Sequence, residues 1–130
     1  MAFILVAEDY DEIRVVYRQH LEDAGHRVST ACNGAEALEK ALQFPPDLIL
    51  MDIDMPELDG MEALRMLKSD SRFASLRHIP VVLLTCHAMP KQVQAGLDAG
   101  CDAYIVKPVD SREIVAELDL FLNSGEVMRP

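Results

Sequence analysis

Acidic, hydroxyl and amine side chains follow four short apolar runs of this chain, each at the point where the run ends. Glu8 and Asp9 follow the first run, Asp52 the second, Thr85 the third and Lys107 the last. A short, continuous apolar run is typical of a parallel strand covered on both faces. Ligands of open α/β sheets bind at the carboxyl ends of such strands, so we interpret Asp52 as a reactive carboxylate at that edge.

The residue types at these strand ends predict phosphoryl chemistry. If the strands before Glu8 and Asp52 are neighbours, their backbones lie about 5 Å apart and the carboxylates crowd together. Crowding raises carboxylate pKa values and destabilises the fold, whereas a hard divalent cation such as Mg²⁺ relieves it. Lys107 adds a positive charge suited to an anion, and Thr85 adds a hydroxyl that can donate to a phosphoryl oxygen. We therefore predict a phosphoryl-transfer site in which Asp52 is the nucleophile.

The elements that must position these residues are five strands alternating with five helices. The sequence predicts strands at residues 3–7, 27–31, 48–51, 81–84 and 103–106, the second at the sheet edge. Helices are predicted at about residues 11–24, 34–44, 61–69, 90–99 and 111–123. Val16 and Leu42 belong to the apolar stripes of the first two helices, and Leu97 is expected to face inward. Residues 71–78 are interpreted as a polar connection. The alternation implies a parallel sheet with helices on both faces and all strand ends along one edge.

Composition and net charge limit the classes of function that the chain can have. Half of the 130 residues are hydrophobic, enough for one compact domain, and the net charge of −10 argues against a nucleic-acid surface. No apolar run is long enough to span a membrane and no signal peptide is evident, so we expect a cytoplasmic protein. The cysteines are odd in number and lack metal-type spacing, which favours reduced thiols.

In their order and spacing, the motifs resemble the response-regulator receiver domain of bacterial two-component signalling. The resemblance covers nearly the whole chain and is carried by Ile4-Leu5-Val6-Ala7-Glu8-Asp9, Leu50-Met51-Asp52-Ile53-Asp54-Met55-Pro56, Asp59-Gly60, Leu84-Thr85 and Tyr104-Ile105-Val106-Lys107-Pro108. It implies a flavodoxin-like α/β fold with a doubly wound parallel sheet of order 2-1-3-4-5. Residues 1–124 would form the receiver domain and residues 125–130 a short tail.

The resemblance also assigns roles at the site. Asp52 would accept a phosphoryl group from a histidine kinase or a histidine phosphotransfer protein, so the chain would be a phosphoacceptor regulator and not an enzyme. Mg²⁺ would be held by Glu8, Asp9, Asp52 and the backbone carbonyl of Asp54. Thr85 and Lys107 would contact the acyl phosphate.

A second set of residues is implied in switching and in phosphate lifetime. Thr85 would move toward the phosphoryl group and Tyr104 would change rotamer to fill the space. This movement would reshape the face made by the fourth helix, fifth strand and last helix, which would contact a downstream protein. Asp54 and His87 border the phosphoryl group, and we expect them to set the autodephosphorylation rate. The chain would be a monomer or a weak dimer.

Two positions depart from the usual family pattern. Glu8 stands where many members have Asp, and its longer arm still suits metal binding. Cys86 stands where a small residue, often Ala, is usual; the thiol is still small enough to leave access for phosphate. The resemblance also raises the expectation of a cis peptide at Lys107-Pro108 above the usual 5–6% for X-Pro bonds.

Two other functions compete with this interpretation. Asp52 and Asp54 also form the D-x-D motif of haloacid-dehalogenase-type phosphatases, with Thr85 and Lys107 as later motifs. Pro56 stands where that family has Thr or Val, the chain lacks room for a cap, and the Glu8-Asp9 pair would go unexplained. The other alternative is a receiver fold used as a fixed interaction module without phosphorylation, against which the complete acidic cluster argues.

Overall fold

The structure, a computed structural model, describes residues 1–86, 89–107 and 109–124 of the chain. Its five strands are β1 (Phe3–Ala7), β2 (Arg27–Ala31), β3 (Leu48–Asp52), β4 (Val81–Thr85) and β5 (Ala103–Val106). Its helices are α1 (Asp11–Asp23), α2 (Gly34–Gln43), α3 (Gly60–Ser69), η1 (Ser71–Leu76), α4 (Pro90–Ala99) and α5 (Ser111–Ser124). The alternation of strands and helices is therefore confirmed.

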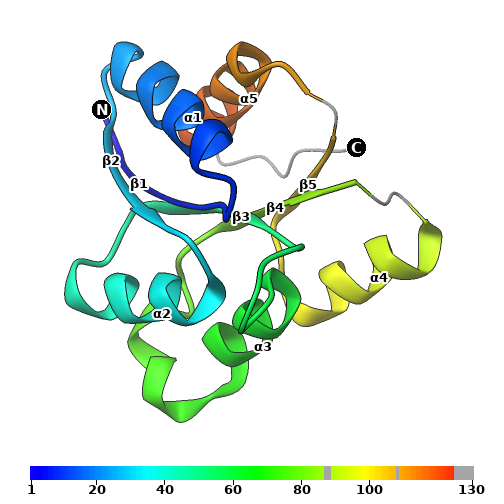
Figure 1. The fold of residues 1–130 in the computed structure, drawn as a ribbon. Coiled ribbons are helices and arrows are strands. Elements are labelled where there is room, and N and C mark those ends of the chain that lie inside the picture. Colours follow the sequence, from blue (N-terminus) through cyan, green and yellow to red (C-terminus); the bar gives the residue numbers. More distant parts are fainter. Residues whose placement is uncertain (87–88, 108, 125–130) are drawn as a thin grey trace.

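All strands pair in parallel, in the order β2-β1-β3-β4-β5. Helices α1 and α5 cover one face of this sheet, and α2, α3 and α4 cover the other (Figure 1). Alternate residues of each strand face opposite layers, so Leu5 and Ile49 pack toward α2 and α3 while Ile4 and Leu48 pack toward α1 and α5. Both faces of β3 are buried, which explains its continuous apolar sequence.

The residues at the helix ends account for where the helices begin and stop. Asn33 and Asp59 cap α2 and α3, because the side chain of each accepts a hydrogen bond from a first-turn N–H. Pro90 occupies the first turn of α4, where its missing N–H costs nothing. Gly100 ends α4 with a φ of 102°, a left-handed conformation that glycine adopts without strain.

The interpretation of residues 71–78 as a purely polar connection was wrong. The stretch contains the short helix η1, whose Phe73 and Leu76 side chains are buried in the layer beside α2 and α3. The inward placement of Leu97 was also wrong, since Leu97 is 43% exposed. Val16 and Leu42, which belong to the apolar stripes of their helices, are likewise more than 40% exposed. An amphipathic helix often carries an apolar stripe wider than the strip that contacts the core.

The helices within the described part of the chain are all too short or too polar to cross a lipid bilayer.

Candidate functional site

Strand register brings the predicted site residues to one edge of the sheet, which we call the carboxyl edge. Ala7 in β1 pairs with Met51 in β3. Glu8 follows Ala7 and Asp52 follows Met51, so Glu8 and Asp52 lie side by side. Asp52 in turn pairs with Leu84 on β4, and Thr85 pairs with Val106 on β5. Lys107 follows Val106 directly, and its backbone N–H donates to the Thr85 carbonyl at 2.8 Å.

Three carboxylates meet at this edge. Glu8, Asp9 and Asp52 each offer an oxygen, and these oxygens lie within 4.8 Å of one another. Glu8 is 0% exposed and Asp52 is 1% exposed, so neither carboxylate is solvated as it would be on a surface. Asp9 Oδ1 is buried and has no hydrogen-bond partner among the described residues. A buried carboxylate oxygen without a donor, beside two further carboxylates, is the donor set that a hard divalent cation requires.

Lys107 is the cation that already faces the cluster. Its Nζ contacts Asp52 Oδ2 and lies 3.3 Å from Glu8 Oε1. Burial alone would lower the pKa of Lys107, but the hydrogen bond and charge of Asp52, with the charge of Glu8, raise it. Lys107 is therefore charged at neutral pH.

Glu8 is the acid whose ionisation the site most disfavours. Burial, followed by the hydrogen bond and charge of Asp52, raises the pKa of Glu8 to about 7. A backbone hydrogen bond from the Tyr10 N–H to Glu8 Oε2, 3.2 Å long, acts in the opposite direction. The cluster thus carries a proton or needs a further positive charge near neutral pH.

The loop after β3 completes the surroundings of Asp52. The Asp54 N–H donates to Asp52 Oδ1 at 2.9 Å, so both carboxylate oxygens of Asp52 have a donor. The Asp54 side chain itself is exposed. The Gly60 N–H donates to the Ile53 carbonyl at 2.9 Å, and a Cβ at Gly60 would lie 2.2 Å from the Asp52 carbonyl oxygen. Only glycine allows α3 to start this close to β3.

The predicted switch residues lie on adjacent strands. Thr85 is 1% exposed at the end of β4. Tyr104 in β5 is 2% exposed, and its hydroxyl donates to the Gln92 carbonyl in α4 at 2.7 Å. Its ring lies over Gly96, where an added Cβ would be 2.3 Å from the Tyr104 hydroxyl oxygen.

Three predictions fall outside the described residues: the role of His87, the peptide at Pro108 and the tail at residues 125–130.

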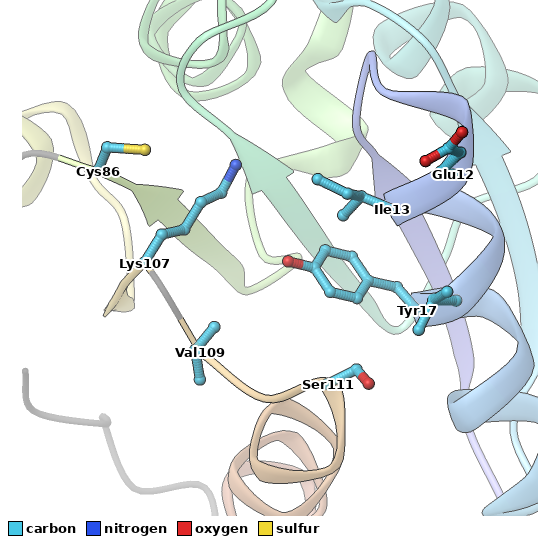
Figure 2. A pocket seen from close by; sticks show the side chains of 8 residues that line it. Glu12, Ile13, Tyr17, Cys86, Lys107, Val109 and Ser111 are labelled. Carbon is cyan, nitrogen blue, oxygen red and sulfur yellow. The ribbon is translucent and has the colours of Figure 1, made fainter.

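Sequence reasoning missed an open pocket of about 750 Å³ beside the acidic cluster. Its lining is largely apolar and comes from α1, the end of β4 and the segment between β5 and α5 (Figure 2). The lining residues are Glu12, Ile13, Val16, Tyr17, Cys86, Lys107, Val109 and Ser111. Figure 2 shows the Tyr17 ring directed from α1 toward Lys107 across the pocket. The signal in the sequence was the run of apolar residues at helical spacing on α1, three of which, Ile13, Val16 and Tyr17, line the pocket.

The family model of the response regulator receiver domain matches residues 4–119. The chain belongs to this family. It is 36% identical over 122 residues to the polar-differentiation response regulator DivK of Brucella anthropi, covering 94% of this chain and 97% of DivK. It is 36% identical over 126 residues to the transcriptional regulatory protein AfsQ1 of Streptomyces coelicolor, covering 97% of this chain and 53% of AfsQ1.

A solved receiver structure has the same architecture. The chemotaxis response regulator CheY4 of Vibrio cholerae superposes with a TM-score of 0.83 at 32% identity, covering 92% of this chain and 98% of that one. The flavodoxin-like fold implied by the sequence motifs is therefore confirmed. Receiver domains are the phosphorylation-dependent regulators of two-component signalling, and they interact with histidine kinases or phosphotransfer proteins.

Proposed function

We propose that this receiver domain is a signalling switch in which Asp52 accepts a phosphoryl group from a histidine kinase or a histidine phosphotransfer protein. The observation that carries the proposal is the buried cluster of Glu8, Asp9 and Asp52, with one oxygen of Asp9 unpaired and Lys107 in contact with Asp52. The domain would comprise residues 1–124 and act in the cytoplasm.

Asp52, Lys107 and Thr85 have different roles in the phosphoryl transfer. An Asp52 oxygen attacks phosphorus, the P–N bond of the phosphohistidine breaks, and the imidazole leaves with the electron pair. Lys107 stays charged and neutralises part of the anionic charge that gathers on the phosphoryl oxygens. The Thr85 hydroxyl lies one strand away and is of the type that donates to a phosphoryl oxygen. Burial of Asp52 keeps bulk water away from the carboxylate.

Mg²⁺ is the cofactor that the donor set fits. Glu8, Asp9, Asp52 and the backbone carbonyl of Asp54 would hold it. The ion supplies positive charge that offsets the oxygens of the acceptor and of the incoming phosphoryl group. Its binding would also favour the ionised form of Glu8, whose pKa is raised when the cluster is metal-free.

The signal would leave through the face made by α4, β5 and α5. Phosphorylation gives Asp52 additional negative charge and three acceptor oxygens, to which Thr85 would be drawn, and Tyr104 would change rotamer in response. Two exposed apolar side chains support an interaction surface here, because Met89, the residue before α4, is 64% exposed and Leu97 within α4 is 43% exposed. The partner would be a downstream protein, and the chain itself a monomer or weak dimer.

Asp54 and His87 would tune how long the phosphoryl group survives. Two observations support this role for Asp54: its side chain is exposed, and it stands two residues after Asp52. Asp54→Asn and His87→Ala variants should change the decay rate of the labelled protein, and an unchanged rate in both would remove the assignment.

Labelling and turnover separate the switch from the phosphatase alternative. With Mg²⁺ and acetyl phosphate, the intact protein should gain one phosphoryl group per chain, read as a mass increase. It should not turn over a generic phosphomonoester such as p-nitrophenyl phosphate. Sustained turnover that is lost in both Asp52→Asn and Asp54→Asn would instead support the phosphatase. A chain that neither labels nor turns over would be a fixed interaction module.

A further inference from the structure

The start of α2 is bound to the loop that follows β3, although about 20 residues separate them in the sequence. The Gly34 N–H donates to the Leu58 carbonyl at 2.8 Å. A Cβ at Gly34 would lie 2.4 Å from that carbonyl oxygen and 3.1 Å from the Asp59 carbonyl oxygen. The two backbones are therefore in direct contact, and no larger residue fits between them.

Asn33 makes the second connection, and it uses both ends of its side-chain amide. Asn33 Oδ1 accepts from the Glu36 N–H at 2.8 Å, which caps α2. Asn33 Nδ2 donates to Glu57 Oε2 at 2.7 Å. Glu57 has a φ of 65°, a left-handed conformation that is strained for a residue with a Cβ. A strained backbone of this kind persists where neighbouring contacts hold it.

The loop held in this way is the one that shapes the acidic site. Its first part donates the Asp54 N–H to Asp52 Oδ1 at 2.9 Å, and its end returns the Gly60 N–H to the Ile53 carbonyl at 2.9 Å. Both ends are thus bound to β3 or its continuation, and the middle of the loop is bound to α2 through Asn33 and Gly34.

We propose that Asn33 is a positioning residue for the acidic site. Its hydrogen bond to Glu57 holds the loop after β3, which contains Asp54, whose backbone carbonyl would be a ligand of the cation. The inference rests on the proposed function, because it assumes that Mg²⁺ binds at Glu8, Asp9 and Asp52. Neither Asn33 nor Glu57 belongs to the cluster itself.

An exchange of the two polar groups tests the inference without removing the helix cap. In Asn33→Asp the new carboxylate still caps α2, and its charge suits a helix N-terminus, but it faces the Glu57 carboxylate and repels it. In Glu57→Gln the Asn33 donor keeps an oxygen acceptor. In the double variant the new carboxylate at position 33 accepts from the new amide at position 57, and the net charge equals that of the starting protein.

The expected readout is the Mg²⁺ dissociation constant from calorimetric titration with MgCl₂. Asn33→Asp should weaken Mg²⁺ binding by about five-fold, the factor that corresponds to the net contribution of one typical hydrogen bond. Glu57→Gln and the double variant should stay within about two-fold of the starting protein. Coulomb attraction alone predicts the opposite for Asn33→Asp, because an added negative charge attracts the cation.

Amide hydrogen exchange of the Mg²⁺-free protein gives a readout that does not depend on the metal. Residues 54–58 should exchange faster in Asn33→Asp and regain protection in the double variant, while α2 keeps its protection in both. Unchanged Mg²⁺ affinity and loop protection in Asn33→Asp would overturn the positioning role. So would a double variant that remains as weak as Asn33→Asp. If the starting protein itself binds no Mg²⁺, the proposed function fails, and the exchange result still decides whether Asn33 holds the loop.

Discussion

The two edges of the sheet place carboxylates in opposite surroundings. At the amino edge, where the strands begin, Asp47 Oδ2 accepts from the Phe3 N–H and Asp102 Oδ2 accepts from the Val81 N–H, each at 2.8 Å. At the carboxyl edge, Asp9 Oδ1 lacks a donor among the described residues, and the pKa of Glu8 is raised to about 7. Asp47 and Asp102 thus satisfy backbone N–H groups of the strands. At the carboxyl edge, in contrast, one oxygen of Asp9 lacks a donor and the ionised form of Glu8 is disfavoured.

The difference shows how to separate structural from functional acids. A carboxylate that accepts a strand N–H stabilises the folded chain whether or not a ligand is present. Buried carboxylates that face one another destabilise it until a cation arrives. The same residue type therefore has opposite consequences at the two edges, and substitutions at each edge should differ in what they change.

The largest difference is expected in phosphorylation. Asp52→Asn should reduce labelling by acetyl phosphate to background, because an amide is not a competent nucleophile for this transfer. Asp47→Asn, the same chemical change at the amino edge, should label as the starting protein does. Intact-protein mass spectrometry with Mg²⁺ present measures both. Labelling that survives Asp52→Asn would show that another residue is the acceptor.

The next effect is a pH dependence of stability that arises from Glu8 at the carboxyl edge. The pKa of Glu8 is raised from 4.5 to about 7, so the folded state binds a proton more tightly than the unfolded state. The stability that the protonated Glu8 contributes to the folded state is fully present below about pH 4.5 and is lost as the pH rises through about 7. The shift corresponds to roughly 3 kcal/mol.

Urea unfolding in EDTA from pH 4.5 to 8 checks this prediction, with Glu8→Gln as the control. The difference in unfolding free energy between the two proteins should change across that interval, because the amide does not titrate. A constant difference between Glu8→Gln and the starting protein would contradict the raised pKa.

The third effect is the stabilisation that Mg²⁺ gives. A ligand at 100 times its dissociation constant raises the free energy of unfolding by about 2.7 kcal/mol. Asp9→Ala should lose most of this increment, because it removes the oxygen that lacks a partner in the metal-free protein. In EDTA the same variant should be at least as stable as the starting protein, because Asp9 Oδ1 has no hydrogen-bond partner to lose and one of three crowded carboxylates is removed. A large loss of stability in EDTA would mean that Asp9 has a structural role.

Much of the fold followed from the sequence because buried parallel strands produce continuous apolar runs. The predicted strands at residues 3–7, 27–31 and 103–106 match the structure residue for residue. The short helix η1 was missed because its two buried residues, Phe73 and Leu76, stand among polar ones and are too few to show a helical period. The exposed Leu97 was misplaced because helical spacing defines an apolar stripe but not how much of its width is buried.

The residues of the site could be predicted from the sequence for the same reason as the strands. Glu8, Asp52, Thr85 and Lys107 are adjacent to apolar runs, so strand order alone brought them together. The hydrogen bond between Asn33 and Glu57 could not be predicted from the sequence. It joins two loops that are 24 residues apart, and loops have no periodic pattern that would indicate their paths. The unpaired oxygen of Asp9 and the pocket beside Lys107 depend on side-chain packing, which sequence spacing does not contain.

The smallest effect, and the one that best isolates the amino edge, is expected for Asp102. Asp102→Ala leaves the buried Val81 N–H without its carboxylate acceptor and should lower the free energy of unfolding by about 1–2 kcal/mol. Asp102→Asn keeps an oxygen acceptor and should lose less than half of that. Because Asp102 lies at the opposite end of β4 and β5 from Thr85 and Lys107, neither variant should alter Mg²⁺ affinity or labelling. Mg²⁺ binding is measured under conditions in which Asp102→Ala is fully folded. Weaker binding in this variant would mean that the two edges are coupled through β4 and β5. An acid that is hydrogen-bonded within the fold would then still affect the metal site.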